Sequence, residues 1–423
     1  MTRVLVVDDS RFVRAVVGDA LIEAGYVVET APDGATAIDV VDRFRPDVIT
    51  MDVEMPGIGG TETIERIMTS RPTPIVVLSV HTATDGEAAM DALAHGAMDV
   101  LKKPDESDDR TLEEYTMEIV ETVEELSNAD VSSLALARVT ASATRTTRTD
   151  TRGGGGSSRS PTRSPSKNGS RRVDSESETT NDTAIDAGFE TTNDTESETV
   201  AGTKICAKRT PDVDLSTCPA PTVVIGASTG GPRIVERVLA ALPLELGARV
   251  IVVQHMPGAF TERFADRLDR TSPYSVTEAK SESRVRPGEA VVAPGDRHLR
   301  CSSACADSVT VSPVRGDLIH GVRPSVDVTM TSAATAIDEH PLVGIVLSGM
   351  GRDGARGIEA IHDAGGTTLA QNERTSPVFG MAKAAIERGA VDAVVSPATI
   401  PERVIEAVAP ASAAIPGGER QHG

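Results

Sequence analysis

The chain lacks the features of a secreted or membrane-embedded protein. It has four cysteines in 423 residues, too few for a disulfide framework in a chain of this length. No segment approaches the roughly 20 uninterrupted apolar residues that a membrane span requires. The first apolar segment, Val4–Val7, is too short for a signal peptide and runs into two aspartates, where a cleavage site would need small residues. We therefore expect a cytoplasmic protein without membrane insertion.

Metal-binding cysteine clusters and net positive charge are also missing. Cys301 and Cys305 are spaced loosely like metal ligands, but no second cysteine pair or histidine pair follows, so we interpret them as buried or incidental thiols. The formal net charge is −21, and residues 1–125 account for most of it, with 10 Lys and Arg against 27 Asp and Glu. This acidity argues against nucleic acid as a partner.

Composition divides the chain into four parts. We predict a first domain over residues 1–125, a flexible linker over 126–217, a second domain over 218–408 and a disordered tail over 409–423. Ser, Thr, Gly and charged residues dominate the linker, which has almost nothing apolar with which to form a core. A basic block in the linker could bind nucleic acid or a membrane, but a solvated tether is the favoured interpretation.

Apolar segments alternate with helical patterns in the first 125 residues. The apolar segments are Val4–Val7, Val27–Val28, Val48–Met51, Ile75–Leu78 and Val100–Leu101. The helical patterns lie near residues 10–24, 34–43, 61–70, 86–94 and 111–126. This alternation predicts a five-stranded parallel sheet with helices on both faces, which is a doubly wound α/β fold.

Polar side chains follow the predicted strands of this first domain. They are Asp8, Asp9, Asp52, Ser79 and Lys103. In an open parallel sheet the carboxyl ends of the strands form one edge, where ligands bind. Three carboxylates at that edge would repel one another without a hard divalent cation, which predicts Mg²⁺ at Asp8, Asp9 and Asp52. A single acid there would be interpreted as a helix cap, but the full set is more specific.

With a lysine-proline pair after its fifth strand, this domain as a whole resembles the receiver domain of two-component response regulators. The resemblance implies that Asp52 accepts a phosphoryl group from a histidine kinase and that Asp8 and Asp9 hold Mg²⁺. It also implies that Ser79 and Lys103 relay the change as switch residues.

The run from Val223 to Gly231 is typical of a buried strand that turns into a helix through small residues. Within it, Gly226-x-Ser228-x-Gly230 has the spacing of a nucleophile elbow, in which small neighbours let the chain turn sharply and present the serine oxygen. The alternative is a glycine-rich turn whose serine caps the following helix.

Two further polar residues follow apolar strands in the second domain. The strand predicted over 249–253 leads to His255, and the strand predicted over 342–347 leads to Asp353. In a parallel sheet these ends share an edge with the end of the strand before Ser228, so the three side chains can lie within hydrogen-bonding reach. A serine hydroxyl becomes a good nucleophile when a histidine takes its proton and a carboxylate orients that histidine.

Other histidines and aspartates of this domain are weaker candidates. His298 and His320 lie among turns and short strands, and His362 falls in a predicted helix, so surface or packing roles are favoured. Asp327 lies where a helix begins and is expected to cap it. Asp296 is expected in a turn.

The order Ser…His…Asp differs from the Ser…Asp…His order of the α/β-hydrolases. The motifs Gly-Ala-Ser-Thr-Gly-Gly, Gln-His-Met-Pro and Gly-Met-Gly-x-Asp-Gly carry these three residues. With them, residues 218–408 resemble the catalytic domain of the chemotaxis-specific protein-glutamate methylesterases. Further matches are Ala-Pro-Gly-Asp-Arg-His at 293–298 and Arg-Pro-Ser-Val-Asp at 323–327. A receiver domain followed by this domain is the usual order in that family.

The resemblance implies a substrate and a mechanism. Methylated glutamates on the cytoplasmic helices of chemoreceptors would be hydrolysed, and particular glutamines would be deamidated. Ser228 would attack the ester carbonyl with His255 as base, methanol would leave, and water would release the carboxylate. Thr229 and Met350 are candidates for the oxyanion site, with ordinary packing as the alternative for Met350. We expect a monomer that uses no cofactor at the esterase site.

Two other functions remain open at this point. One is a hydrolase of the same fold that acts on another ester, and the other is a non-catalytic response regulator whose second domain binds a partner. In relatives the receiver covers the catalytic face until phosphorylation loosens it. A linker this long lowers the effective concentration of the receiver, which predicts weaker inhibition than a short linker would give.

Overall fold

The computed structural model describes residues 1–80, 83–104, 111–127, 129, 219–338 and 340–408. The linker predicted over 126–217 lies outside the described residues except at 126, 127 and 129. The tail predicted over 409–423 lies wholly outside them.

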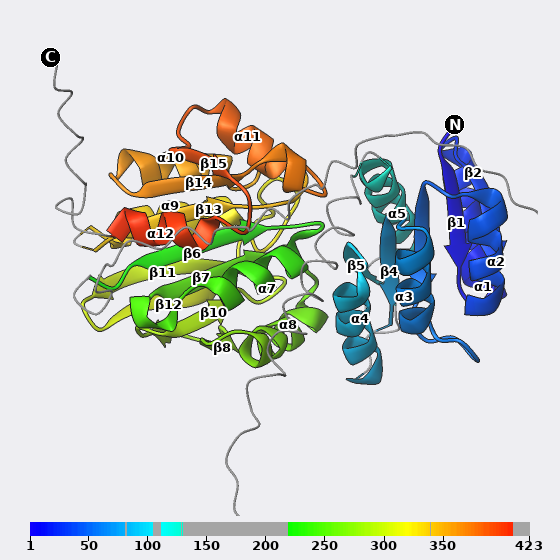
Figure 1. Ribbon diagram of the computed structural model, residues 1–423, viewed down its shortest axis with the longest axis horizontal. Coiled ribbons are helices and arrows are strands. Elements are labelled where there is room, and N and C mark those ends of the chain that lie inside the picture. The colour runs from blue at the N-terminus through cyan, green and yellow to red at the C-terminus, as the bar shows by residue number, and fades with distance from the viewer. Residues whose placement is uncertain (81–82, 105–110, 128, 130–218, 339, 409–423) are drawn as a thin grey trace, which may run out of the picture. The chain divides into compact units, whose positions relative to one another are not determined.

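The N-terminal part folds around a five-stranded parallel sheet with the strand order β2-β1-β3-β4-β5 (Figure 1). The strands are β1 (Arg3–Val7), β2 (Val27–Ala31), β3 (Val48–Asp52), β4 (Ile75–Ser79) and β5 (Asp99–Lys102). The helices are α1 (Arg11–Glu23), α2 (Gly34–Phe44), α3 (Gly60–Ser70), α4 (Ala83–His95) and α5 (Leu112–Leu126). The predicted doubly wound parallel fold is confirmed.

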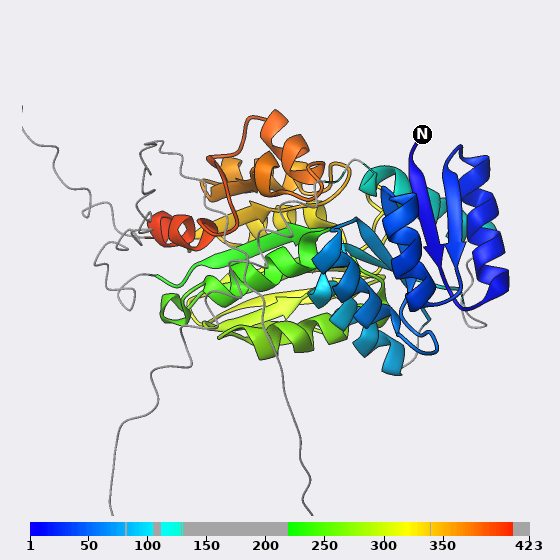
Figure 2. The same ribbon diagram turned by 45° about the vertical axis from the view of Figure 1, so that its right-hand side comes forward.

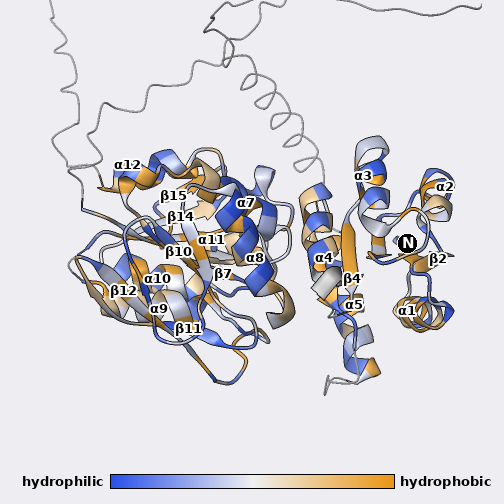
Figure 3. Ribbon diagram, turned by 90° about the horizontal axis from the view of Figure 1, so that it is seen from below, coloured by the Kyte–Doolittle hydropathy of each residue, from blue (hydrophilic) through white to orange (hydrophobic). Residues whose placement is uncertain are grey.

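Both faces of this sheet are apolar because both are covered by helices. On β1, Leu5 and Val7 pack in one core with residues of α2 and α3, whereas Val4 and Val6 pack in another core with residues of α1 and α5. The strand β4 is buried at every position and is orange, the colour of hydrophobic residues, in Figure 3. Because successive side chains of a strand point to opposite faces of the sheet, each strand contributes to both cores.

The C-terminal part contains a seven-stranded sheet with the order β15-β14-β13-β6-β7-β10-β8, in which all neighbouring strands are parallel. Its strands are β6 (Thr222–Ala227), β7 (Arg249–Gln254), β8 (Ser275–Glu278), β10 (Glu289–Val292), β13 (Leu342–Val346), β14 (Thr367–Gln371) and β15 (Ala393–Val395). A second, antiparallel sheet consists of β11 (His298–Cys305), β12 (Ser308–Val314) and β9 (Ser283–Val285).

Helices cover both faces of the seven-stranded sheet, whose strands run side by side in green to orange in Figure 1 and again in Figure 2. The α-helices are α7 (Gly231–Ala241), α8 (Gly258–Thr271), α9 (Val326–Ala336), α10 (Ala355–Asp363), α11 (Met381–Glu387) and α12 (Ile400–Val408). Two short 3₁₀ turns are η2 (Leu244–Leu246) and η3 (Glu373–Thr375).

The central strand β6 contributes to a core on each face of this sheet. Val223 and Ile225 lie in a core with residues of α7, α8 and α12, whereas Val224 lies in a core with residues of α9, α10 and β12. The prediction of a second α/β domain is confirmed. Among the described helices, none combines the length and apolar character needed to cross a bilayer.

Candidate active site

Strand order brings the three predicted catalytic residues to one edge of the C-terminal sheet. The strands β13, β6 and β7 are direct neighbours in the order β13-β6-β7, and all three are parallel. Ser228 follows β6, His255 follows β7, and Asp353 lies in the loop after β13. Ala227 pairs with Gln254 in the sheet, so Ser228 and His255 each come directly after a paired position.

The turn after β6 is built from small residues. Gly230 has a φ of 74°, in the left-handed region that glycine adopts without steric cost, and it is the N-cap of α7. No side chain caps this helix, so the alternative role of Ser228 as a helix cap is wrong. Gly349 passes so close that a Cβ added to it would lie 2.7 Å from Ser228 Cβ. The packing around Ser228 therefore leaves no room for a larger neighbour at position 349.

His255 and Asp353 form a direct hydrogen bond. The distance from His255 Nε2 to Asp353 Oδ2 is 2.8 Å, and both side chains are largely buried. With Nε2 engaged by the carboxylate, Nδ1 is the ring nitrogen that remains for the serine proton. An imidazole held in this way is oriented by its carboxylate partner, as general-base catalysis requires.

Asp353 is held at the N-terminus of α9. Its carboxylate accepts the N–H of Val326 at 2.6 Å, the N–H of Asp327 at 3.0 Å and the hydroxyl of Ser325 at 2.8 Å. Burial alone would raise the pKa of Asp353, but the bond from His255 and these backbone donors outweigh it and hold the pKa below its usual value. The free N–H groups and dipole of a helix N-terminus favour an anion at this position. Asp353 is therefore held as a carboxylate.

The structure corrects the predicted role of Asp327. This residue was expected to cap the helix in which it lies, but Ser325 is the N-cap of α9. The carboxylate of Asp327 instead accepts the N–H groups of Gly354 at 3.0 Å and Gly357 at 2.7 Å, at the start of α10. His320 Nε2 lies 2.9 Å from its other oxygen. Asp327 thus fixes the start of the helix that directly follows Asp353.

The carboxylates of Asp327 and Asp353 do not suit a metal ion, although with His320 they place one ligand atom each within 4.8 Å of one another. Each carboxylate oxygen already accepts at least one hydrogen bond from the groups just described. A cation here would have to displace those donors, including the imidazole of His255.

The oxyanion candidates lie in the two turns that flank the serine. Thr229 is buried and Met350 is half-buried. Within the parts of the chain that the structure describes, neither backbone N–H has a recorded hydrogen-bond acceptor. The Thr229 carbonyl accepts the hydroxyl of Ser348 at 2.8 Å, which ties these two turns together. Two N–H groups without partners beside a serine are the donors that an oxyanion site needs.

The remaining polar candidates have structural surroundings. His298 is buried, with Nε2 2.8 Å from the Asp317 carbonyl and Nδ1 accepting the Ser325 N–H at 3.2 Å. His362 is exposed and lies 3.6 Å from an Asp392 oxygen. Asp296 lies in a turn at a φ of 62°.

The two described thiols of the second domain lie in different surroundings. Cys301 is buried and Cys305 is exposed, both as free thiols. The former packs in the core behind the antiparallel sheet. This agrees with the interpretation of the pair as buried or incidental cysteines.

The N-terminal domain brings together the polar residues predicted at its strand ends. Lys103 Nζ lies 2.7 Å from Asp8 Oδ2 and 3.0 Å from Asp52 Oδ2, in a site where Asp8 and Asp52 are buried. Burial raises the pKa of Asp52, with Lys103 opposing and Asp8 adding to the rise. Burial would lower the pKa of Lys103, but the two carboxylates outweigh it and raise that pKa.

The same carboxylates fit a hard cation. Asp8, Asp9 and Asp52 each place an oxygen within 4.8 Å of the others, and carboxylate oxygens are the donors that Mg²⁺ prefers. Asp9 is exposed and does not cap α1, because Ser10 Oγ accepts the N–H of Val13 in that role. The site opens into a pocket of about 420 Å³ that Asp8, Asp9, Asp52 and Lys103 help to line. Ser79, the last residue of β4, is buried and its carbonyl accepts the Lys103 N–H at 2.8 Å.

Comparison with known proteins decides the family. Residues 4–115 match the model of the response regulator receiver domain, and residues 223–404 match that of the CheB methylesterase. The chain is 39% identical over 409 residues to the protein-glutamate methylesterase/protein-glutamine glutaminase of Halobacterium salinarum, covering 96% of this chain and 99% of that relative. The chain belongs to the protein-glutamate methylesterase/protein-glutamine glutaminase family.

A second relative and a solved catalytic domain show similar sequence identity. The relative from Haloarcula marismortui is 40% identical over 407 residues, covering 96% of this chain and 97% of that relative. The crystal structure of the Thermotoga maritima CheB methylesterase catalytic domain is 41% identical and covers 44% of this chain and 98% of its own, with a TM-score of 0.42. The family resemblance predicted from the motifs is confirmed.

Some residues that build this methylesterase-type site were not found from the sequence. Ser325 and Asp327 hold the Asp353 loop, and Gln254 Nε2 donates to the carbonyls of Ser228 at 2.9 Å and His255 at 3.1 Å. The available signal was the run Arg-Pro-Ser-Val-Asp, in which a serine precedes a helix. That signal predicts a cap, but it does not show that the helix start faces a distant carboxylate.

Proposed function

We propose that this chain hydrolyses glutamate methyl esters on chemoreceptors, under the control of phosphorylation at Asp52. The observation that carries the proposal is the strand order β13-β6-β7, which delivers Ser228, His255 and Asp353 to one edge, with His255 and Asp353 already bonded at 2.8 Å. The substrate class comes from the names of the relatives, protein-glutamate methylesterase/protein-glutamine glutaminase.

The proposed reaction has two halves. Ser228 Oγ attacks the ester carbonyl carbon while its proton passes to His255 Nδ1, and the N–H groups of Thr229 and Met350 stabilise the oxyanion. The tetrahedral intermediate expels the methoxy group, which takes the proton from His255 and leaves as methanol. Water then attacks the acyl-serine and gives a proton to His255. The bond to Oγ breaks, Ser228 regains its proton, and the glutamate carboxylate is released.

The same geometry supports deamidation of receptor glutamines. The amide carbonyl carbon of glutamine is attacked in the same way, and the proton held by His255 goes to the leaving nitrogen, which departs as ammonia. Hydrolysis of the acyl-serine then gives the same glutamate carboxylate. One site therefore converts both an ester and an amide side chain into an acid.

The receiver domain would regulate this activity. A carboxylate oxygen of Asp52 accepts the phosphoryl group from a phosphohistidine of a kinase. Lys103 Nζ, now held between Asp8 and Asp52, is placed to donate to a phosphoryl oxygen, and Ser79 supplies a hydroxyl nearby. Mg²⁺ bound by Asp8, Asp9 and Asp52 would neutralise charge on the phosphoryl oxygens.

The decisive test is methanol release from a methyl-labelled chemoreceptor fragment. The full chain is expected to release labelled methanol, Ser228→Ala to release none, and Asp52→Ala to lose the response to a phosphodonor while keeping the basal rate. Circular dichroism confirms that each variant is folded. If the folded wild-type chain releases no methanol, the proposal is wrong, and a non-catalytic binding role replaces it. Activity on small esters alone would instead indicate a hydrolase with another substrate.

A further inference from the structure

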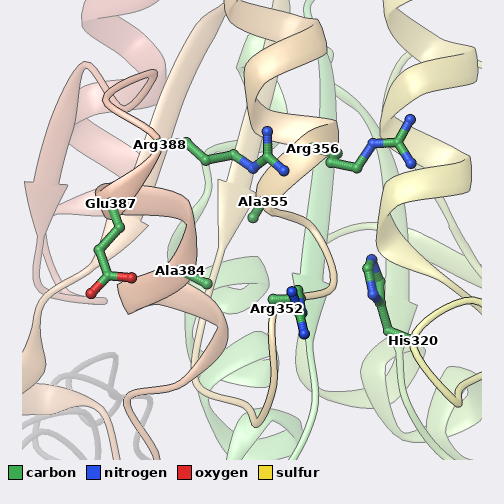
Figure 4. A pocket seen from close by; sticks show the side chains of 7 residues that line it. All are labelled: His320, Arg352, Ala355, Arg356, Ala384, Glu387 and Arg388. Atoms are coloured by element: carbon green, nitrogen blue, oxygen red, sulfur yellow. The ribbon is translucent and has the colours of Figure 1, made fainter.

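A second, cationic pocket lies beside the loop that carries Asp353. It has a volume of about 400 Å³, and its polar lining consists of Arg352, Arg356, Arg388, His320 and Glu387 (Figure 4). None of these residues was assigned a role in the reaction. The pocket is formed entirely by the second domain, between the loop around His320, the start of α10 and the end of α11.

Two of the arginines have no charge partner. Among the described residues, no carboxylate lies within ion-pair distance of Arg352 or Arg356, and both are exposed. Arg388 is paired with Glu359. In Figure 4 the carboxylate of Glu387 and the guanidinium group of Arg356 stand on opposite sides of the view.

The other polar side chains of the pocket have partners within the domain. Glu387 lies 4.0 Å from Lys383, one turn earlier on α11. His320 is bonded to Asp327 at 2.9 Å. The pocket therefore keeps two guanidinium groups free to bind an anion, and arginine matches the two oxygens of a carboxylate with paired N–H groups.

The position of these arginines connects the pocket to the serine. Arg352 directly precedes Asp353, and Arg356 lies in the first turn of α10. The same loop begins at Gly349, which packs against Ser228. The loop from Gly349 to Arg356 therefore links the surroundings of Ser228 to this pocket.

We infer that this pocket is a carboxylate subsite, which binds an acidic side chain of the protein substrate on the same helical face as the scissile ester. This inference rests on the proposed function. Residues three, four or seven positions apart share one face of a helix, about 5 to 11 Å along its axis. The product of each reaction is a glutamate carboxylate, so hydrolysis of one ester creates a ligand for this subsite next to a remaining ester.

Two matched peptides test the inference. Both are helix-forming and carry one glutamate methyl ester, and they differ only in having Glu or Gln four and seven residues away. The value of kcat/KM for methanol release by the full chain is expected to be about fivefold higher for the Glu peptide at low salt, and this preference should shrink as salt is added. The double variant Arg352→Gln/Arg356→Gln is expected to reduce the ratio to about one.

The control is Arg403→Gln on α12, which removes one guanidinium charge outside the pocket, against two in the double variant, and should preserve the ratio. The variant Arg352→Lys/Arg356→Lys keeps the positive charge without the paired N–H groups. It should retain part of the preference for the Glu peptide. A ratio near one in the wild-type chain, or a ratio that survives in the Gln variant, overturns the inference.

A binding measurement separates this inference from the proposed function. Fluorescently labelled peptides are titrated with the full chain carrying Ser228→Ala, and their anisotropy is followed. Tighter binding of the Glu peptide, lost in the arginine variant, supports the subsite even if methanol is never released. Methanol release with equal binding of the two peptides supports the esterase and refutes the subsite. Failure of both peptides to bind also refutes it.

Discussion

The carboxylate of Asp353 accepts the backbone N–H of Val326 at 2.6 Å, so the first turn of α9 holds the acid that orients His255. One residue begins a helix and the other lies in a loop 27 positions later, and neither is adjacent to the serine in the sequence. The contact gives the proposed base a fixed partner whose charge is stabilised by helix N–H groups as well as by the imidazole.

Replacing the acid should impair catalysis without unfolding the protein. Asp353→Asn keeps the shape of the side chain but removes its charge, so the imidazole loses the partner that stabilises its protonated form. We expect kcat for methanol release to fall by about 10³ to 10⁴, as for the acid of a serine protease triad. The measurement is steady-state release from labelled receptor, with the folded state checked by circular dichroism. A loss below tenfold would exclude Asp353 as the orienting acid.

Asp327 should act as a positioning residue. Asp327→Asn retains one acceptor oxygen but places an amide against the N–H groups of Gly354 and Gly357 or against His320. We expect a stability loss of ~1–3 kcal/mol and a fall in kcat with little change in KM. Denaturant unfolding and steady-state kinetics measure the two effects. Asp363→Asn, at the exposed far end of α10, is the control and should change neither. Wild-type kcat in Asp327→Asn would contradict the assignment.

The low pKa of Asp353 predicts how stability depends on pH. Its pKa in the folded domain lies below the ordinary value of 3.8, so folding favours the ionised form. This contribution is present above about pH 4 and is lost as the pH falls through the folded-state pKa. The difference in unfolding free energy between wild type and Asp353→Asn should therefore shrink between pH 5 and pH 2. Denaturant titrations at several pH values measure it, and a difference that stays constant over this range would argue against an ionised Asp353.

Removing the divalent cation should abolish regulation but spare the esterase. With a small-molecule phosphodonor, chelation of Mg²⁺ is expected to eliminate the stimulation of methanol release while leaving the basal rate unchanged. Asp52→Asn should show the same basal rate with or without Mg²⁺. Phosphoryl incorporation at Asp52 can be followed in parallel by mass spectrometry after hydride trapping. Loss of basal activity on chelation would place the metal requirement in the esterase domain instead.

The long predicted linker should weaken inhibition by the receiver. About 90 residues separate the two predicted domains, and the effective concentration of a tethered domain falls with tether length. We expect the unphosphorylated full chain to be slower than residues 218–423, by a factor that grows when the linker is shortened. The measurement compares methanol release by the full chain, by the full chain with a shortened linker and by residues 218–423. Equal rates for all three would show that the receiver does not inhibit.

The sequence was sufficient to predict which polar residues meet at one edge of each sheet. Ser228, His255 and Asp353 each follow an apolar strand, and the ends of parallel strands share one edge of a sheet. The three side chains therefore converge if their strands are neighbours, as β13, β6 and β7 are. The role of Asp327 could not be predicted in the same way. Local patterning places it in the first turn of its own helix, whereas its partners, the N–H groups of Gly354 and Gly357, meet it only through the packing of α9 on α10.

The cationic pocket shows the same limit of sequence reasoning. Arg352 lies in the loop before α10 and Arg356 in its first turn, but Arg388 comes from the end of α11 and His320 from a distant loop. A run of charges is usually a solvated face, and nothing in the spacing shows which arginines are left without an acidic partner. Whether an arginine has an acidic partner depends on the pairing of Glu359 with Arg388 and of Glu387 with Lys383 in the folded domain.

The placement of β13 beside β6, on the side opposite β7, also has a consequence for biosynthesis. A ribosome-bound nascent chain that has completed β6 and β7 already carries the nucleophile and the base side by side, but it lacks the acid until every residue from β8 to α9 has been translated and β13 has paired. Long-range pairing of this kind closes a large loop and is slow. We therefore expect esterase competence to be acquired late, in a single step, as β13 enters the sheet.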